Sequence, residues 1–243
     1  MQYRFKFNGI DSDTMGVTVL ARPSIKRAER RHTFENIDGR YGNPDFYDGL
    51  NTITTEMQIA VETEDETQEV RAWLYGHGIF EQNEFKDLYQ EIYIIGGVTF
   101  ERRVSGLYVA TVQMLATDPY WYDKEDTWDS QPPENNVVIV ENKGNVESLP
   151  KIRIETLGTA FYVKLDINGV LIDLTFATKY SSITIDSKNK ITYFEDNPKL
   201  RADGLFADLE FPTLQVGTNA IVSVDGGIGT DYNIFIKEES RWQ

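Results

Sequence analysis

The chain has 243 residues and a mass of 27.9 kDa, enough for one large domain or two small ones. Hydrophobic residues make up 40 % and charged residues 26 %, so the chain can bury a core, and no run reaches the ~20 apolar residues of a membrane-spanning helix. The net charge of −15 predicts repulsion from nucleic-acid phosphates and anionic lipids, so we expect neither stable nucleic-acid binding nor membrane insertion.

Cysteine is absent, which excludes disulfides, thiolate metal sites and cysteine nucleophiles. The first seven residues alternate polar and apolar side chains without the apolar stretch of a secretory signal, so we expect no signal peptide. Both features fit a chain that folds in a reducing cytoplasm.

Alternating apolar residues predict strands through most of the first half. Tyr3, Phe5 and Phe7 alternate with polar residues before Asn8-Gly9, a pair that favours a tight turn. Further strands are predicted at residues 15–20, 53–61, 88–95, 98–101 and 106–116. The glycine pair Gly96-Gly97 predicts a hairpin between two of them.

One segment, residues 63–76, reads as a helix. Thr63 and Asp65 are candidate caps, and acids crowd its first turn, where the helix dipole favours them. Val70, Trp73 and Leu74 share one apolar face, so we expect the helix to pack on a sheet through Trp73. Gly76 and Gly78 are natural stops, which would place His77 at the helix end.

The polar, acidic stretch 123–136 contains Pro132-Pro133 and reads as a linker. It separates a first domain, residues 1–122, from a second, residues 137–243. Short strands recur in the second domain, with turns such as Asn168-Gly169 between them, and predict an antiparallel sandwich of roughly eight strands. These strands are expected at residues 137–140, 151–155, 161–167, 170–176, 182–186, 190–194, 209–214 and 220–224.

No catalytic, metal or cofactor site stands out. With 39 acidic residues, paired carboxylates arise by chance, and the glycine-rich run 225–231 lacks the Lys-Ser/Thr pair of a phosphate-binding loop. Residues 42–49 lack the ligand spacing of a calcium loop, so a turn-rich loop is preferred. His32, expected at a polar strand position, and His77 have no evident triad partners. We therefore predict a protein that is not an enzyme.

The one basic run consists of Arg22, Lys26, Arg27, Arg30 and Arg31. Three interpretations stay open: a solvated strand face, a contact with an acidic neighbouring surface such as another copy of the chain, or the lining of a channel through which DNA passes. The run is accordingly a candidate subunit-interface or channel element.

Aromatic residues gather where the two predicted domains meet. Asp118, Pro119, Tyr120, Trp121 and Tyr122 form a junction motif at the end of the long strand, and Trp128 follows in the linker. Packing at the junction is the favoured interpretation, and an aromatic platform for a sugar is the alternative.

Several short sequence motifs occur in a characteristic order along the chain. They are Asp38-Gly39-Arg40-Tyr41-Gly42, Trp73-Leu74 in the helix, the junction motif, Asn142-Lys143-Gly144-Asn145, Ser148-Leu149-Pro150, Ile152-Arg153-Ile154 and a run from Phe211-Pro212 to Gly217-Thr218-Asn219. This set resembles the distal tail protein (Dit) family of long-tailed, non-contractile bacteriophages over nearly the whole chain.

The resemblance implies a mainly β fold, with an N-terminal ring-forming domain that carries one helix and a C-terminal galectin-like antiparallel β-sandwich. It implies a structural role in the virion, at the tail tip, after assembly in the host cytoplasm. Six copies would form a hub ring, with stacked rings as a further arrangement. The ring would join the tail tube and tape measure proteins to tail-associated and receptor-binding proteins. The alternatives are a carbohydrate-binding or receptor-binding module of the tail tip and, with less support, a cell-wall hydrolase.

Overall fold

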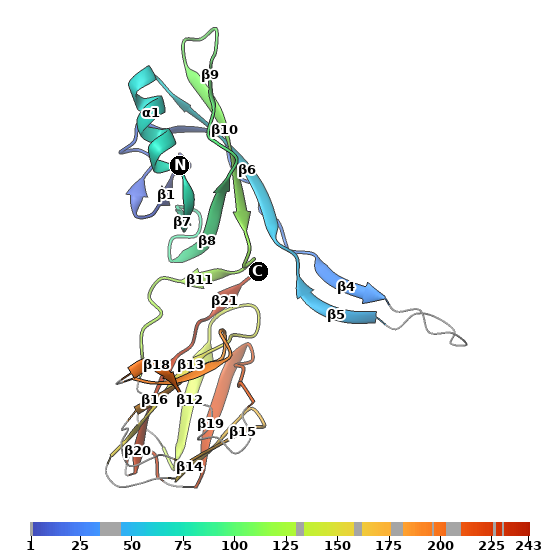
Figure 1. The fold of residues 1–243 in the computed structure, drawn as a ribbon, viewed down its shortest axis with the longest axis vertical. Helices are drawn as coiled ribbons and strands as arrows, with labels where there is room; N and C mark the ends of the chain where they lie inside the picture. Colours follow the sequence, from blue (N-terminus) through green and yellow to red (C-terminus); the bar gives the residue numbers. More distant parts are fainter. Residues whose placement is uncertain are drawn as a thin grey trace, which may run out of the picture. The chain divides into compact units, whose positions relative to one another are not determined.

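The computed structural model describes residues 2–34, 45–129, 134–157, 162–175, 182–195, 197–202, 210–225, 227–229 and 231–243. The chain divides into two compact units, Met1–Lys124 together with Gln243, and Glu125–Trp242 (Figure 1). Both units are built from antiparallel strands, and α1 (Glu64–Trp73) is the one helix among the described residues. The predicted mainly β fold is therefore confirmed. The family motif Asp38–Gly42 and the pair Pro132-Pro133 lie outside the described residues.

The first unit is organised around one antiparallel sheet with the strand order β2-β1-β7-β8-β10-β6-β3. Strand β9 pairs with β10, strand β11 pairs with β8, and β4 and β5 form a separate two-stranded ribbon. The strands are β1 (Phe5–Phe7), β2 (Ile10–Asp11), β3 (Thr18–Ala21), β4 (Arg30–Phe34), β5 (Asp45–Leu50), β6 (Ile53–Val61), β7 (Gly76–Gln82), β8 (Leu88–Ile95), β9 (Phe100–Arg102), β10 (Tyr108–Ala116) and β11 (Trp121–Asp123).

The first hairpin follows from two residues that accept a left-handed backbone. Asn8 and Gly9 have φ values of 51° and 79°, and they join β1 to β2 with Phe7 opposite Ile10. Positive φ at both central positions suits the right-handed twist of the flanking strands. The predicted turn is confirmed here, as are the predicted strands 53–61 and 88–95.

The helix begins as its sequence predicts and ends earlier. The Thr63 hydroxyl accepts from the Glu66 amide at 3.3 Å, and the Glu66 carboxylate accepts from the Thr63 amide at 2.9 Å, a reciprocal capping box. The predicted helix end at Gly76 is wrong because the helix stops at Trp73 and Gly76 opens β7. His77 therefore lies in a strand, where its Nε2 is 3.7 Å from a carboxylate oxygen of Glu91.

The predicted hairpin at Gly96-Gly97 is also wrong. Both β8 and β9 run antiparallel to β10, so they run in the same direction and follow each other along one side of that strand. Ile95 lies opposite Gln113, and Phe100 lies opposite Ala110. Gly96, with φ of 69°, interrupts a continuing strand path instead of reversing it.

The second unit consists of a four-stranded sheet, β12-β19-β14-β15, and a five-stranded sheet, β18-β17-β16-β13-β20. Fully buried side chains of both sheets, such as Ile152, Leu165 and Tyr232, share one core, so the predicted antiparallel sandwich is confirmed. The strands are β12 (Val137–Asn142), β13 (Lys151–Thr156), β14 (Tyr162–Ile167), β15 (Val170–Thr175), β16 (Ser182–Asp186), β17 (Ile191–Phe194), β18 (Asn197–Arg201), β19 (Gly217–Asp225), β20 (Tyr232–Lys237) and the short β21 (Arg241–Trp242).

One predicted strand of the sandwich is wrong. Residues 210–214 form no strand, and Leu214 makes only an isolated bridge with Ser148. Pro212 lacks an amide hydrogen, and the carbonyl oxygens of Leu214 and Gln215 accept from the side chains of Asn142 and Asn219. Side-chain amides thus take the place of a neighbouring strand. Strands β18 and β20 were not predicted, although Tyr232, Ile234 and Ile236 alternate clearly.

Candidate interaction surface

The predicted basic run does not lie on one strand. Arg22, Lys26 and Arg27 belong to an extended segment, residues 22–29, that follows the edge strand β3 and that we call the strap. Arg30 and Arg31 begin β4, and both are exposed. Within the described residues, no backbone group of residues 22–28 forms a backbone hydrogen bond, and the strap regains one only where the Glu29 carbonyl accepts from the Asn51 amide at 2.9 Å.

Side chains hold the strap to the first unit's sheet. The Arg22 guanidinium pairs with Glu84 and lies 5.6 Å from the centre of the Tyr3 ring. The Lys26 ammonium donates to the Thr54 carbonyl at 2.7 Å. Burial, together with the charge of Glu84, raises the pKa of Tyr3, whose hydroxyl stays protonated as a donor.

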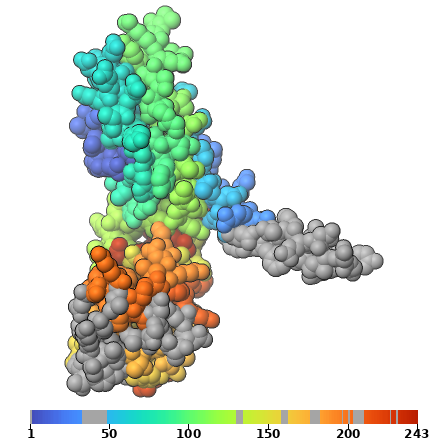
Figure 2. Space-filling model, in the orientation of Figure 1, coloured from blue at the N-terminus to red at the C-terminus, as the bar shows by residue number. Residues whose placement is uncertain are grey.

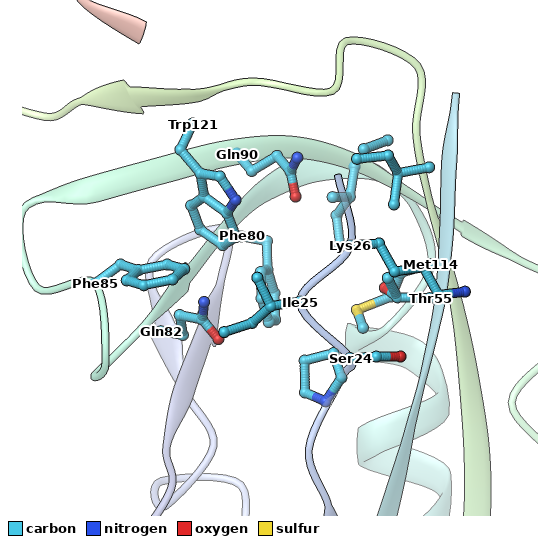
Figure 3. A pocket seen from close by; sticks show the side chains of 14 residues that line it. Ser24, Ile25, Lys26, Thr55, Phe80, Gln82, Phe85, Gln90, Met114 and Trp121 are labelled. Carbon is cyan, nitrogen blue, oxygen red and sulfur yellow. The ribbon is translucent and has the colours of Figure 1, made fainter. Parts of the chain in front are cut away.

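Between the strap and the sheet lies a small cavity of about 40 Å³ (Figure 3). Its floor is made of buried side chains from β7, β8 and β10, whereas Ile25 at its mouth is 76 % exposed. The complete lining is Pro23, Ser24, Ile25, Lys26, Ile53, Thr55, Phe80, Gln82, Phe85, Gln90, Ile92, Met114, Ala116 and Trp121.

Two glutamines give the cavity polar groups. The Gln82 side-chain oxygen accepts from the Tyr3 hydroxyl at 2.7 Å. The Gln90 side chain is 8 % exposed and, within the part of the chain that the structure describes, makes no hydrogen bond. Its amide faces the cavity (Figure 3).

The junction motif folds as a compact turn on the first unit. The Asp118 carboxylate accepts from the Tyr122 hydroxyl at 2.6 Å and from the Tyr120 amide at 3.3 Å, with Pro119 buried between them. Trp121 packs edge-on against Phe85, with ring centroids 5.1 Å apart. The rings of Trp121 and Tyr122 therefore pack within this unit, Tyr122 against Tyr89 at a centroid distance of 5.8 Å.

Trp128 lies in the second unit and is not a bare platform. The Arg153 guanidinium carbon is 4.8 Å from the centre of the Trp128 ring and 4.5 Å from that of Phe235. This cation–π stack occupies one of the two faces of the indole on which a sugar ring could stack.

Two buried asparagines, Asn142 and Asn219, have a structural role in the sequence motifs of the second unit. The Asn142 amide donates to the carbonyls of Val146 and Leu214, and its oxygen accepts from the Gly144 amide. Asn219 donates to the carbonyls of Gln215 and Gly217. Both side chains are 3 % exposed or less and hold loops together, so these motifs are structural.

The remaining candidates from the sequence are the histidine His32 and the acidic residues of the segment 42–49. His32 lies at an exposed strand position in β4, as predicted, and Asp45 and Asp48 lie in β5 rather than in the expected loop. Among the described residues, no group of three or more His, Cys, Asp or Glu side chains could hold a metal ion. Over the same residues, no helix is long and apolar enough to cross a membrane.

Sequence reasoning missed the exposed apolar residues next to the basic run. Leu20 and Ile25 are 50 % and 76 % exposed. The only signal in the sequence was a pair of isolated aliphatic residues among charged neighbours, which does not tell exposure from burial.

Neither a protein-family model nor a curated protein sequence matches the chain. Among solved structures, the crystal structure of the SPP1 Dit (gp 19.1) protein, described as a paradigm of the hub adsorption apparatus in phages that infect Gram-positive bacteria, superposes with a TM-score of 0.72 at 10 % identity, covering 97 % of this chain and 98 % of that one. Two structures of the phage p2 baseplate in its activated conformation are also similar. The one with Sr has a TM-score of 0.44 at 11 % identity, covering 97 % of both chains. The one with Ca has a TM-score of 0.46 at 11 % identity, covering 100 % of this chain and 99 % of that one. The predicted resemblance to the Dit fold is confirmed.

Proposed function

We propose that this chain is a structural hub protein at the distal end of the tail of a long-tailed, non-contractile phage or prophage. The observation that carries the proposal is the superposition on the SPP1 Dit protein across 97 % of the chain. Because that similarity spans both units, it supports a shared architecture and not one common module. It has no bearing on sequence-specific contacts, since the identity is 10 %.

In this role, copies of the chain form a ring of six. The ring joins the tail tube and tape measure proteins to tail-associated and receptor-binding proteins, and the chain is not itself an enzyme. The edge strand β3 and the strap that follows it support self-association, because they leave backbone groups and apolar side chains uncovered. We further propose that the first unit forms the ring and that the second is a galectin-like sandwich.

Mass and shape test this proposal. The purified chain would be analysed by native mass spectrometry and negative-stain microscopy over a wide concentration range. A species of six 27.9-kDa copies, about 167 kDa, with a central hole is expected. The same chain should capture the tail tube and tail-tip proteins encoded with it. A chain that stays monomeric throughout and captures none of them would refute the hub role.

A glycan array separates the hub from the carbohydrate-binding alternative. Because Arg153 covers one face of Trp128, we expect no glycan binding. Binding that Trp128→Ala abolishes and Trp121→Ala preserves would favour the alternative, since Trp121 packs within the first unit.

A further inference from the structure

We infer that the strap of one copy binds the acidic start of α1 on a second copy, in a head-to-tail contact. The inference rests on the proposed ring and names the surfaces that would build it. The strap surface is Leu20 with residues 22–29. The acidic surface consists of Glu62, just before the N-cap, Glu64 and Asp65 in the first helical turn, and Glu69 in the second, all exposed.

The strap surface lacks a partner in several independent ways. Residues 22–28 have no backbone hydrogen bonds within the described chain, and the edge strand β3 pairs only with β6. Leu20 and Ile25 expose 50 % and 76 % of their surface. Exposed edges with apolar side chains are templates for pairing with another chain.

The positive charge of the strap indicates that its partner surface is acidic. Lys26 and Arg27 form no ion pair among the described residues, although the chain has 39 acidic side chains against 24 basic ones. A positive surface on a chain of net charge −15 fits an acidic partner, and another copy supplies one.

The acidic surface is equally uncompensated. None of the carboxylates of Glu62, Glu64, Asp65 and Glu69 forms an ion pair within the described residues. The neighbouring Glu66 is excluded from this surface because its carboxylate is engaged in the capping box. The helix appears on the surface of the first unit, in cyan, in Figure 2.

The two surfaces lie at opposite ends of one strand and cannot neutralise each other within a copy. Lys26 bonds the Thr54 carbonyl at the beginning of β6, and Glu62 directly follows Val61 at its end. Nine residues of strand span roughly 27 Å, well beyond the screening length of about 8 Å at physiological salt. Figure 1 shows α1 and the ribbon β4–β5 at these opposite ends. Two different complementary patches generate a head-to-tail contact, and such contacts close into rings when the rotation fits.

Charge reversal with rescue tests the contact. Variant one carries Lys26→Glu and Arg27→Glu, and variant two carries Glu64→Lys and Asp65→Lys. Each alone should lose self-association, with an apparent Kd raised at least about tenfold, because like charges then face each other. A 1:1 mixture of the two should recover oligomers of alternating composition, resolved by native mass spectrometry. A single chain with all four changes should also recover them.

Controls separate charge effects from misfolding. Lys143→Glu with Lys190→Glu reverses two exposed cations of the second unit, whereas both surfaces belong to the first unit, and should leave assembly unchanged. Because lysines in the first turn oppose the helix dipole, Glu62→Lys with Glu69→Lys provides a second acidic-surface variant. Circular dichroism verifies that each variant is folded.

The outcomes also distinguish this inference from the proposed function. Loss in the single-surface variants with recovery in the mixture supports the contact. A ring that forms equally well in every variant overturns the strap contact and leaves the hub role standing. A wild-type chain that stays monomeric at low salt overturns the contact and the self-assembled ring together.

Discussion

The indole ring of Trp73 stacks on the phenyl ring of Phe5, with ring centroids 5.4 Å apart and planes inclined by 9°. Its Nε1 also donates to the Phe7 carbonyl at 2.9 Å. One side chain therefore attaches the end of α1 to β1 by both an apolar and a polar contact. The predicted packing of the helix through Trp73 is confirmed, although the indole is only partly buried.

Replacing Trp73 should separate these two contributions. We expect Trp73→Ala to lower the free energy of unfolding by about 3 kcal/mol, since it removes a large aromatic ring from the edge of the core. Trp73→Phe keeps a ring over Phe5 and loses the hydrogen bond, so a loss of about 1 kcal/mol is expected. Urea unfolding followed by circular dichroism measures both. A loss below about 1 kcal/mol for Trp73→Ala would show that the stack does not anchor the helix.

Gly144 should tolerate no side chain. A Cβ at this position would lie 2.2 Å from the Arg241 carbonyl oxygen and 2.7 Å from its amide nitrogen, so the backbone of the second unit would have to move. We expect Gly144→Ala to destabilise that unit by more than about 3 kcal/mol. Gly169→Ala is the control, because its Cβ would meet nothing within 4 Å.

The control variant Gly169→Ala is itself expected to lose some stability, so the two variants are compared with each other. Gly169 has a φ of 86°, so alanine there is strained by about 1 kcal/mol without any clash. Thermal unfolding of the two variants should therefore show a clearly larger loss for Gly144→Ala. Equal losses would mean that the close approach to Arg241 relaxes at little cost.

Lys151 should stabilise two buried carboxylates. Its ammonium lies 3.4 Å from Asp186 and 3.2 Å from Glu239, which are 3 % and 8 % exposed. Burial raises the pKa of Glu239, and the two carboxylates outweigh the burial of Lys151 and raise its pKa. We expect Lys151→Met to cost about 3 kcal/mol at pH 7, because it leaves two carboxylates buried together. Lys164→Met, which removes a partly exposed pair with Asp173, should cost less than about 1 kcal/mol.

The same cluster predicts a pH dependence with a definite sign. Without Lys151, the Glu239 carboxylate loses the cation that offsets its burial, so its raised pKa in the folded state favours the protonated form, and stability increases as the pH falls from 8 toward 5. The deficit of Lys151→Met should therefore shrink on acidification. In the wild type, the raised pKa of Lys151 contributes stability that is lost only above about pH 10.5. Urea midpoints at several pH values test this, and a deficit independent of pH would contradict it.

The sequence correctly predicted elements that depend on neighbouring residues. It did not predict which strands pair with each other, because strand pairing depends on residues far apart in the chain. The turn at Asn8-Gly9, the strand 53–61 and the capping box at Thr63 follow from neighbouring residues alone. The Gly96-Gly97 hairpin failed because β10 accepts both flanking strands on the same side, a relationship that no local pattern encodes.

The candidate surface was harder to predict for the same reason. The five basic residues were visible as a run, but their division between the strap and β4 depends on where β3 stops pairing with β6. Ile25 lies at the mouth of a cavity that side chains from five strands, β6, β7, β8, β10 and β11, line. Composition alone cannot show that an aliphatic residue is left uncovered.

The boundary between the units is a prediction that fragments can test. The sequence places residues 123–136 in a linker, yet residues 125–129 make specific contacts with the sandwich. The Asp129 amide and carbonyl bond Ile236 at 2.8 and 2.9 Å, Asp126 lies 3.4 Å from the Lys237 ammonium, and Trp128 stacks on Arg153.

We expect a fragment 125–243 to fold alone, with dispersed amide NMR signals. A fragment 137–243, which lacks these contacts, should be less stable by about 2–4 kcal/mol, since it loses two backbone hydrogen bonds and a cation–π stack. Trp128→Ala in the longer fragment isolates the stack and should account for about 1 kcal/mol of that loss. Equal stability of the two fragments would show that residues 125–129 belong to the linker and do not stabilise the sandwich.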